Sequence, residues 1–157
     1  MTAFFWNLLL ATVWALAQGD FTLPNLLIGF VLGYVVLWLA RDVLQSSEYT
    51  ARVPRLIEFA LYFLWELLLS NLRVAYDVLT PRHHMRPGII ALPLDATTDG
   101  EITLLANFIS LTPGTLSLDV SPDRKTLYVH LMYIRDPEAE KQKLKTGLER
   151  RLLSLLR

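Results

Sequence analysis

The sequence lacks cysteine, and it lacks basic residues across its first forty positions. The missing cysteine excludes disulfide frameworks, thiolate metal sites and cysteine nucleophiles from the 157-residue chain. All 15 lysines and arginines lie at Arg41 or beyond, and Asp20 is the only charged side chain before that point. The formal net charge is +0, so there is no general basic excess of the kind that binds phosphate backbones. We therefore expect no nucleic-acid partner.

Apolar residues, in contrast, are abundant. They make up 53% of the chain, and the mean hydropathy of +0.36 is high for an ordinary soluble domain. Residues 3–17 and 21–40 are two runs without charge. A helix rises about 1.5 Å per residue, so roughly 20 residues cross a hydrocarbon core of about 30 Å. The second run has that length and the first is shorter. Their polar linker contains Gly and Pro, so residues 1–40 predict a transmembrane helical hairpin.

Two short patterns inside these runs need interpretation. Ala15-Leu16-Ala17 is similar to a signal-peptidase site, but no basic residue precedes the first run and a second apolar run follows at once, so we expect the first helix to be retained. Gly29 and Gly33 form a small-xxx-small pair on one face of the second run. Such a pair lets another helix approach closely in lipid, although glycine is also simply frequent in membrane helices.

A third apolar segment, residues 56–79, carries one polar stripe. Its members recur at intervals of three or four residues, which places them on one face of a helix: Glu58, Tyr62, Glu66, Ser70, Arg73 and Asp77. The helix either spans the membrane and hides the stripe against partner helices, or lies on the membrane surface with the stripe facing water or protein. If Glu66 occupies a buried subunit contact, its replacement by alanine should impair assembly or exchange; otherwise it should be tolerated.

Basic residues flank this third segment on both sides. Arg41, Arg52 and Arg55 precede it, and Arg82 and Arg86 follow it. Because basic loops stay on the cytoplasmic side, a full third crossing would place one of the two basic stretches outside. Two crossings followed by a surface-lying amphipathic helix satisfy both stretches, and we prefer this arrangement for residues 41–88.

Residues 89–157 predict a small α+β domain with a β-α-β-β-α order. The expected elements are a strand at 89–94, a helix at 100–111 capped by Asp99, strands at 115–120 and 126–134, and a helix that begins at Pro137. In the second strand, alternation predicts that Leu116, Leu118 and Val120 face inward. Thr112-Pro113-Gly114-Thr115 joins the first helix to this strand, and Pro-Gly suits the centre of a type II turn.

Residues with chemical potential are few. The hydroxyl cluster of Ser110, Thr112, Thr115 and Ser117 has no G-x-S-x-G elbow, so local backbone bonding is the better interpretation. His83-His84 has no third ligand at metal-binding spacing, and His130 is expected to face solvent. We expect no catalytic residue, no metal, no cofactor and no small-molecule substrate bound by this chain alone.

The order of elements and the phrase NFISLTPGTLSLDVSPDRKTLYVHLMY resemble the E subunit of Mrp/Mnh-type multisubunit cation/proton antiporters. The similarity covers essentially the whole chain and is most specific from Asn107 to His130. It implies a non-catalytic subunit of a bacterial or archaeal plasma-membrane assembly that exchanges Na+ or K+ for protons, supporting cation and pH homeostasis, while large A and D subunits carry the ion paths.

The expected partners are then the other antiporter subunits and the lipid bilayer, with the C-terminal domain in the cytoplasm. Gly29, Gly33, Glu58 and Glu66 are the candidate helix-packing or subunit-interface positions. The alternative is an independent membrane-anchored binding module whose C-terminal domain recruits a soluble partner.

Overall fold

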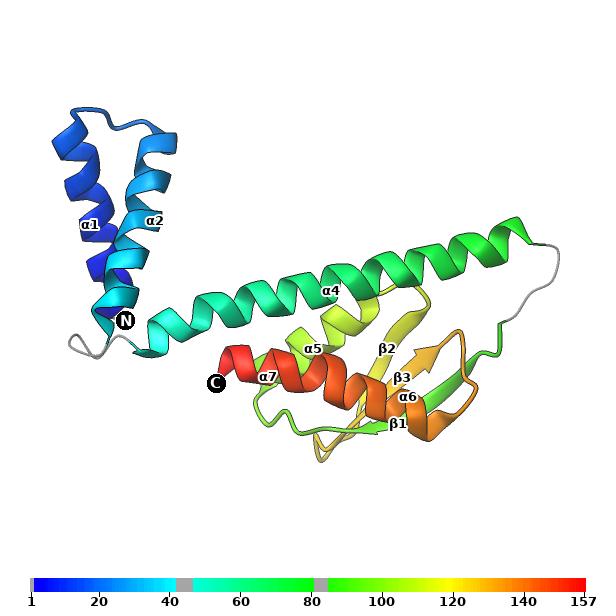
Figure 1. Cartoon of the computed structure of the whole chain (residues 1–157). Helices are drawn as coiled ribbons and strands as arrows, with labels where there is room; N and C mark the ends of the chain where they lie inside the picture. Colours follow the sequence, from blue (N-terminus) through cyan, green and yellow to red (C-terminus); the bar gives the residue numbers. More distant parts are fainter. Residues whose placement is uncertain (1, 42–46, 81–84) are drawn as a thin grey trace. The chain divides into compact units, whose positions relative to one another are not determined.

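The computed structural model describes residues 2–41, 47–80 and 85–157. The chain forms two compact units, Met1–Leu56 and Ile57–Arg157. The predicted regions had boundaries at residues 40 and 88, whereas the boundary between the compact units falls inside one long helix, α4 (Figure 1). His83 and His84 lie outside the described residues, as does Arg82 of the second basic stretch.

The first unit contains a helical hairpin, α1 (Thr2–Gln18) and α2 (Leu23–Leu39). Gly19 ends α1 because its φ of +67° is a left-handed conformation that glycine adopts without a Cβ penalty. Its N–H donates to the Leu16 carbonyl at 3.1 Å, and that of Asp20 donates to the Ala15 carbonyl at 3.2 Å. These two bonds make a Schellman cap. The Asp20 carboxylate then accepts from the Thr22 N–H at 3.2 Å and leads the chain into α2.

The two helices of the hairpin approach each other closely at Gly29 and Gly33, which are both buried. A Cβ on Gly29 would lie 2.9 Å from the carbonyl oxygen of Ala11 and 3.0 Å from the Cβ of Trp14. A Cβ on Gly33 would collide with the side chain of Asn7. Both glycines of α2 therefore face α1 of the same chain. At Gly29 the obstacle is backbone, so a larger residue there would separate the helices, whereas at Gly33 it is the end of the Asn7 side chain.

Within the described residues, none of the helices is sufficiently long and apolar to cross a membrane. Both α1 and α2 have 17 residues, because the cap at Gly19 and the start of α2 at Leu23 shorten the two apolar runs. The predicted membrane crossing of the hairpin is thus not confirmed. Large apolar side chains nonetheless cover its outside, including Phe5, Leu16 and Val31, each more than half exposed.

Helix α4 (Ser47–Leu79) begins earlier than the predicted residue 56. Pro54 lies inside it and has no N–H for the carbonyl of Thr50, one helical turn earlier. The hydroxyl of Tyr34 in α2 donates to that carbonyl at 2.9 Å instead. The amide of Asn7 in α1 also donates to the hydroxyl of Tyr49, at 2.9 Å. The first turns of α4 are therefore bonded to the hairpin, which explains how the helix tolerates its proline.

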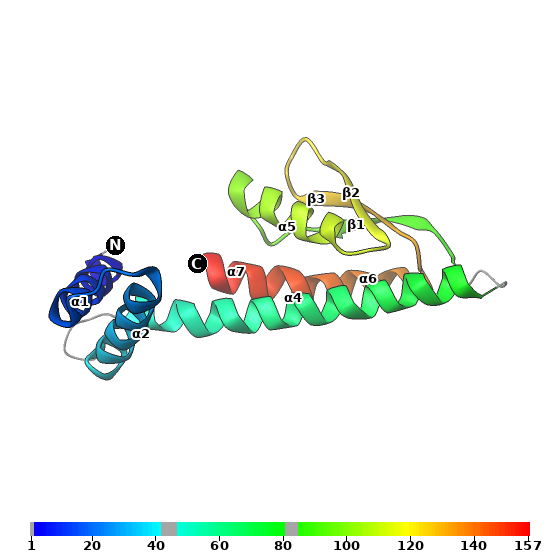
Figure 2. The same cartoon turned by 90° about the horizontal axis from the view of Figure 1, so that it is seen from above.

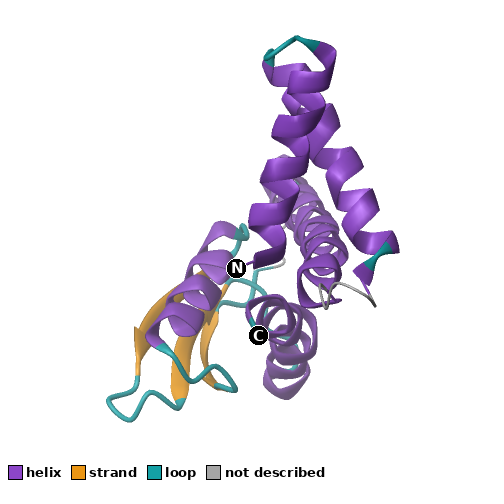
Figure 3. Ribbon diagram, turned by 90° about the vertical axis from the view of Figure 1, so that its left-hand side faces the viewer, coloured by secondary structure: helices purple, strands orange, loops and turns teal. Residues whose placement is uncertain are grey.

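The second unit is built on a three-stranded antiparallel sheet, shown in orange in Figure 3. Its strands lie in the order β1-β3-β2: β1 (Gly88–Pro93), β3 (Thr126–Leu131) and β2 (Thr115–Val120). Ile90 and Ser117 both lie opposite Val129, so these residues share one face of the sheet. This inner face carries the core residues of β1 and β3, and helices cover it.

The prediction that Leu116 and Leu118 face inward is wrong. Their exposed fractions are 49% and 47%, and only Val120 packs against the core. A bulge between Ser117 and Asp119 changes the alternation of β2. Upstream of it the inner positions hold hydroxyl residues, and Ser117 Oγ donates to the carbonyl of Ala106 at 3.0 Å. Bonding to the neighbouring helix, rather than apolarity, therefore decides which face of β2 is inward.

Four helical elements follow or interrupt the strands. They are α5 (Asp99–Leu111), α6 (Pro137–Lys143), a π-helical segment η1 (Leu144–Glu149) and α7 (Arg150–Leu156). The predicted β-α-β-β-α order is confirmed. Leu105 and Ile109 of α5 and Leu152 of α7 join the core over the inner face. Helix α4 packs outside them, where Phe59 and Phe63 each meet the ring of Phe108 at 4.9 Å between centroids.

The predicted N-cap of α5 is displaced by one residue. Thr98, not Asp99, is the cap: its Oγ1 accepts from the Glu101 N–H at 3.2 Å, and the Glu101 carboxylate accepts from the Thr98 N–H at 3.2 Å. This reciprocal pair is a capping box. Asp99 instead forms an exposed ion pair with Arg124 at 2.8 Å. Thr98 is preferred as the cap because the capping box satisfies two backbone N–H donors at the start of the helix.

Candidate functional site

The polar stripe of α4 is turned toward the C-terminal helix of the same chain. Figure 2 shows α4 and the α6–α7 segment running side by side. Lys143 Nζ lies 2.9 Å from Glu66 Oε2, and Arg151 Nε lies 3.6 Å from Glu58 Oε1. The Arg151 guanidinium also stacks over the ring of Tyr62, 4.3 Å from its centroid. Residues 56–79 are thus amphipathic as predicted, and the second unit itself supplies the partners of their charged groups.

The two candidate carboxylates differ in exposure. The side chain of Glu66 is 20% exposed, whereas that of Glu58 is 69% exposed. Between them, Tyr62 reaches Gly147 in η1, where any Cβ would collide with the tyrosine hydroxyl. The wider π-helical turn and its glycine therefore make room for a residue of the stripe. The stripe and the C-terminal helix are complementary in both charge and shape.

The opposite face of α4 is apolar and exposed. Six large side chains on it have exposed fractions of 50–63%: Leu61, Leu64, Trp65, Leu68, Leu72 and Tyr76. They recur at intervals of one, three or four residues, so they lie on one side of the helix. A continuous apolar face of this kind is typical of surfaces that contact another protein or a membrane.

The Thr112–Thr115 turn lies close to the polar stripe. Gly114 has a φ of +86°, and the Thr115 N–H donates to the Thr112 carbonyl at 3.1 Å, as a turn with Pro-Gly at its centre requires. The Thr112 hydroxyl donates to the Phe108 carbonyl at 3.1 Å, and that of Thr115 donates to the Thr112 carbonyl at 2.9 Å. Both hydroxyls are engaged with the backbone, so the turn has a structural rather than a nucleophilic arrangement.

A small cavity of about 70 Å³ separates this turn from α4. Glu66 and Ser70 of the stripe line it from one side, the four turn residues line it from another, and Lys143 of α6 completes it. The cavity brings two sequence features together that the chain separates by more than thirty residues. We call this region the stripe–turn site.

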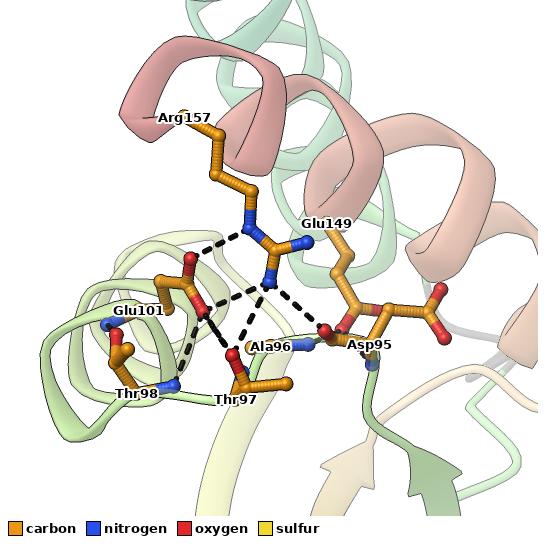
Figure 4. A network of polar contacts seen from close by, with 7 residues as sticks. All are labelled: Asp95, Ala96, Thr97, Thr98, Glu101, Glu149 and Arg157. Atoms are coloured by element: carbon orange, nitrogen blue, oxygen red, sulfur yellow. Dashed lines mark hydrogen bonds and ion pairs between the residues drawn. The ribbon is translucent and has the colours of Figure 1, made fainter.

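A second polar cluster, shown in Figure 4, lies at the far end of the C-terminal helix. Glu149 is 1% exposed, and its Oε1 accepts from the N–H groups of Asp95 at 2.6 Å and Ala96 at 3.1 Å. Arg157 Nε donates to Glu101 Oε1 at 2.9 Å. These contacts bind the connection between β1 and α5 to the C-terminal helix, and sequence reasoning missed them. The T-x-x-E pattern of Thr98 and Glu101 was the available signal.

The charge of Glu101 is strongly stabilised in this cluster. Hydrogen bonds from Arg157, together with those from the Thr97 and Thr98 N–H groups, lower the pKa of the Glu101 carboxyl to about 2. The same interaction raises the pKa of Arg157. The pair is therefore an ionised link between the start of α5 and the end of α7 at neutral pH.

Metal-binding geometry is absent from residues 2–41, 47–80 and 85–157: no group of three or more histidine, aspartate or glutamate side chains converges there. His130 lies on the outer face of the sheet, half-buried and opposite Ile89 and Leu116. The main feature of the candidate site in the described residues is thus the amphipathic helix α4. Its polar face packs within the chain, and its apolar face is exposed.

Comparison with known proteins places this geometry in a family. Residues 7–155 match the family described as Na+/H+ ion antiporter subunit. The E subunit of the Na+/H+ antiporter of Alkalihalophilus pseudofirmus is 38% identical over 95% of this chain and 94% of its own length. The E1 subunit of the Na+/H+ antiporter of Staphylococcus epidermidis is 37% identical over 92% of this chain and 91% of its own length.

Two solved structures share the fold. A chain in the Mrp complex from Dietzia sp. is 31% identical, with a TM-score of 0.52 over 66% of this chain and 96% of that one. A chain in the membrane-bound sulfane sulfur reductase, an archaeal respiratory membrane complex, is 25% identical, with a TM-score of 0.60 over 99% of both. From the family match and the two close relatives, this chain belongs to the family of Na+/H+ antiporter E subunits.

Proposed function

We propose that this chain is a non-catalytic subunit of a multisubunit Na+/H+ antiporter in the plasma membrane, where it supports assembly and thereby cation and pH homeostasis. The observation that carries the proposal is the pairing of both stripe carboxylates within the chain: Glu66 with Lys143 and Glu58 with Arg151. An ionisable group inside a membrane is costly unless it is paired, and one without a partner marks a candidate ion path. These two carboxylates instead pair with cations of the chain's own C-terminal helix, Glu66 closely and Glu58 at the exposed surface.

The hairpin supports the same function because its two helices contain no charged side chain. Asp20, its only charged residue before Arg41, lies in the turn between them. We assign the hairpin to the bilayer, since apolar side chains cover its outside. Helices of 17 residues are about 25 Å long, so local thinning or neighbouring subunits must accommodate them.

Helix α4 then lies at the membrane surface, with its exposed apolar face toward lipid and adjoining subunits. The basic residues Arg41, Arg52, Arg55 and Arg86 favour the cytoplasmic side for both ends of this helix. The sheet and the C-terminal helix, which pack on the polar face of α4, are accordingly cytoplasmic. In this arrangement Gly29 and Gly33 build the hairpin, and the apolar face of α4 provides the contact area.

Affinity purification of the complex tests the assembly role. The chain, tagged at its C-terminus and expressed with its native partners, is extracted in mild detergent and the co-purifying proteins are identified. We expect other integral membrane subunits of the antiporter. Recovery of a stable monomer, or of a soluble partner alone, would favour an independent membrane-anchored binding module instead.

The natural absence of cysteine allows a direct test of orientation. Pro122→Cys is placed in the exposed turn between β2 and β3, and Gln18→Cys at the exposed end of α1. A membrane-impermeant thiol reagent should label Pro122→Cys in inverted vesicles only, and Gln18→Cys in intact cells only. Labelling of Pro122→Cys from outside the cell would overturn the cytoplasmic assignment.

A further inference from the structure

We propose that a cleft at the C-terminal end of α4 binds the phosphate headgroup of an anionic phospholipid; this inference rests on the placement of α4 at the membrane surface. The cleft has a volume of about 700 Å³ and is lined by three arginines from separate segments. Arg73 lies in α4, Arg86 precedes β1, and Arg135 lies between β3 and α6.

Tyr133 contacts one of these arginines, and its backbone lies beside the other two. The Arg86 N–H donates to the carbonyl of Met132 at 3.0 Å, and the Ile134 N–H donates to the carbonyl of Arg86 at 2.9 Å, so the backbone of Arg86 pairs beside Tyr133. The guanidinium carbon of Arg73 lies 5.5 Å from the centroid of the Tyr133 ring. Arg135 follows two residues later on the same segment. One guanidinium group, that of Arg73, is thus held over the Tyr133 ring, and the two other arginines are fixed in the cleft lining through the backbone beside it.

The charge that this cleft presents to solvent is positive. All three arginines are exposed, whereas Asp77 is 4% exposed and Glu140 is half-buried. Burial, together with the neighbouring Asp77 carboxylate, raises the pKa of the Tyr133 hydroxyl, which is therefore neutral. Among the described residues, neither Arg86 nor Arg135 forms an ion pair. Their planar forks remain available for the bidentate hydrogen bonds that phosphate oxygens accept.

The position of the cleft favours a lipid over a soluble phosphate. Tyr76 belongs both to the cleft lining and to the exposed apolar face of α4. Val78 and Leu79, just beyond it, are 77% and 83% exposed. A phospholipid can place its headgroup among the arginines while its acyl chains contact these apolar side chains. A free phosphate ion gains nothing from them.

Native mass spectrometry of the full chain in neutral detergent measures the binding of a phospholipid directly. Phosphatidylglycerol, phosphatidylcholine with the same acyl chains, and inorganic phosphate are titrated separately. The double variant Arg86→Gln/Arg135→Gln removes two cleft charges, and Lys125→Gln/Arg150→Gln removes two exposed charges elsewhere. Circular dichroism confirms that each variant is folded.

We expect the unmodified chain and the control variant to prefer phosphatidylglycerol over phosphatidylcholine by about tenfold or more, and the cleft variant by about twofold or less. Inorganic phosphate should not displace the lipid. An equal preference in all three proteins, or displacement by inorganic phosphate at the lipid's concentration, would overturn the proposal. If both lipids bind equally, only the cleft assignment fails; if neither lipid binds any protein, the membrane placement of α4 fails with it.

Discussion

Glu101 shows how a single residue joins local and distant structure in the C-terminal unit. It is the third residue of α5 and completes the capping box with Thr98. Its other carboxylate contacts reach Arg157 at the end of the chain, at 2.9 and 3.1 Å. The local half of this arrangement can be predicted from the T-x-x-E pattern. The distant half depends on where α7 ends in space, which no local pattern specifies.

A pH titration of stability tests the ionised state of Glu101. Because the folded-state pKa of about 2 lies below the ordinary value of 4.5, this carboxylate stabilises the fold above pH 4.5. The contribution is lost progressively as pH falls from about 4.5 toward 2. Glu101→Gln keeps a capping side chain but removes the charge, so its denaturation midpoint should fall less steeply over this range than that of the wild type.

The measurement is the denaturant midpoint of the purified chain in detergent, followed by circular dichroism. Glu138→Gln is the matched control, since that side chain is 76% exposed on α6. The control should keep the acid sensitivity of the wild type. If Glu101→Gln and Glu138→Gln lose stability in parallel with the wild type, the Glu101–Arg157 link contributes nothing.

At the scale of elements, periodicity predicted the helices well and their partners poorly. The four-residue spacing of Glu58, Tyr62 and Glu66 correctly defined the polar face of α4, but not the helix that covers it. The start of α4 was also missed, because the apolar segment begins only at residue 56, whereas the helix begins at Ser47 and contains Pro54. In β2, apolarity alone gave the wrong face for Leu116 and Leu118. Each error concerns contacts between residues far apart in sequence.

Close packing of α1 and α2 predicts a sharp penalty at Gly29. An alanine Cβ there would meet the Ala11 backbone oxygen at 2.9 Å, and backbone cannot move aside as a flexible side chain does. We expect Gly29→Ala to destabilise the hairpin by about 1–3 kcal/mol, the usual cost of overpacking. Denaturation in detergent followed by tryptophan fluorescence detects this, because Trp14 contacts the same site.

Gly100→Ala is the control for this substitution. Gly100 lies in α5 with open space around its Cβ position, so alanine should leave stability unchanged or raise it by up to about 1 kcal/mol through helix propensity. If Gly29→Ala behaves like Gly100→Ala, the two helices are not in the close contact described.

For the whole molecule, the sequence predicted the order of the helices and strands and the family. It did not predict which face of α4 contacts the rest of the chain and which is exposed. The block from Asn107 to His130 indicated the family because the resemblance rests on this turn and hairpin together with the apolar segments that precede them. Whether Glu66 meets another protein or its own chain could not be decided from spacing. The structure places Lys143 beside it, so the polar face of α4 is occupied within the chain and the apolar face is exposed.

The most direct test of a non-catalytic role for this chain removes both stripe carboxylates from the complete antiporter. Na+-dependent proton exchange is measured in inverted vesicles that carry Glu58→Gln/Glu66→Gln, with the amount of assembled complex quantified in the same preparation. We expect exchange per complex within about twofold of wild type, since neither group carries ions. A loss of tenfold or more at a normal level of complex would contradict it and assign the stripe to the ion path.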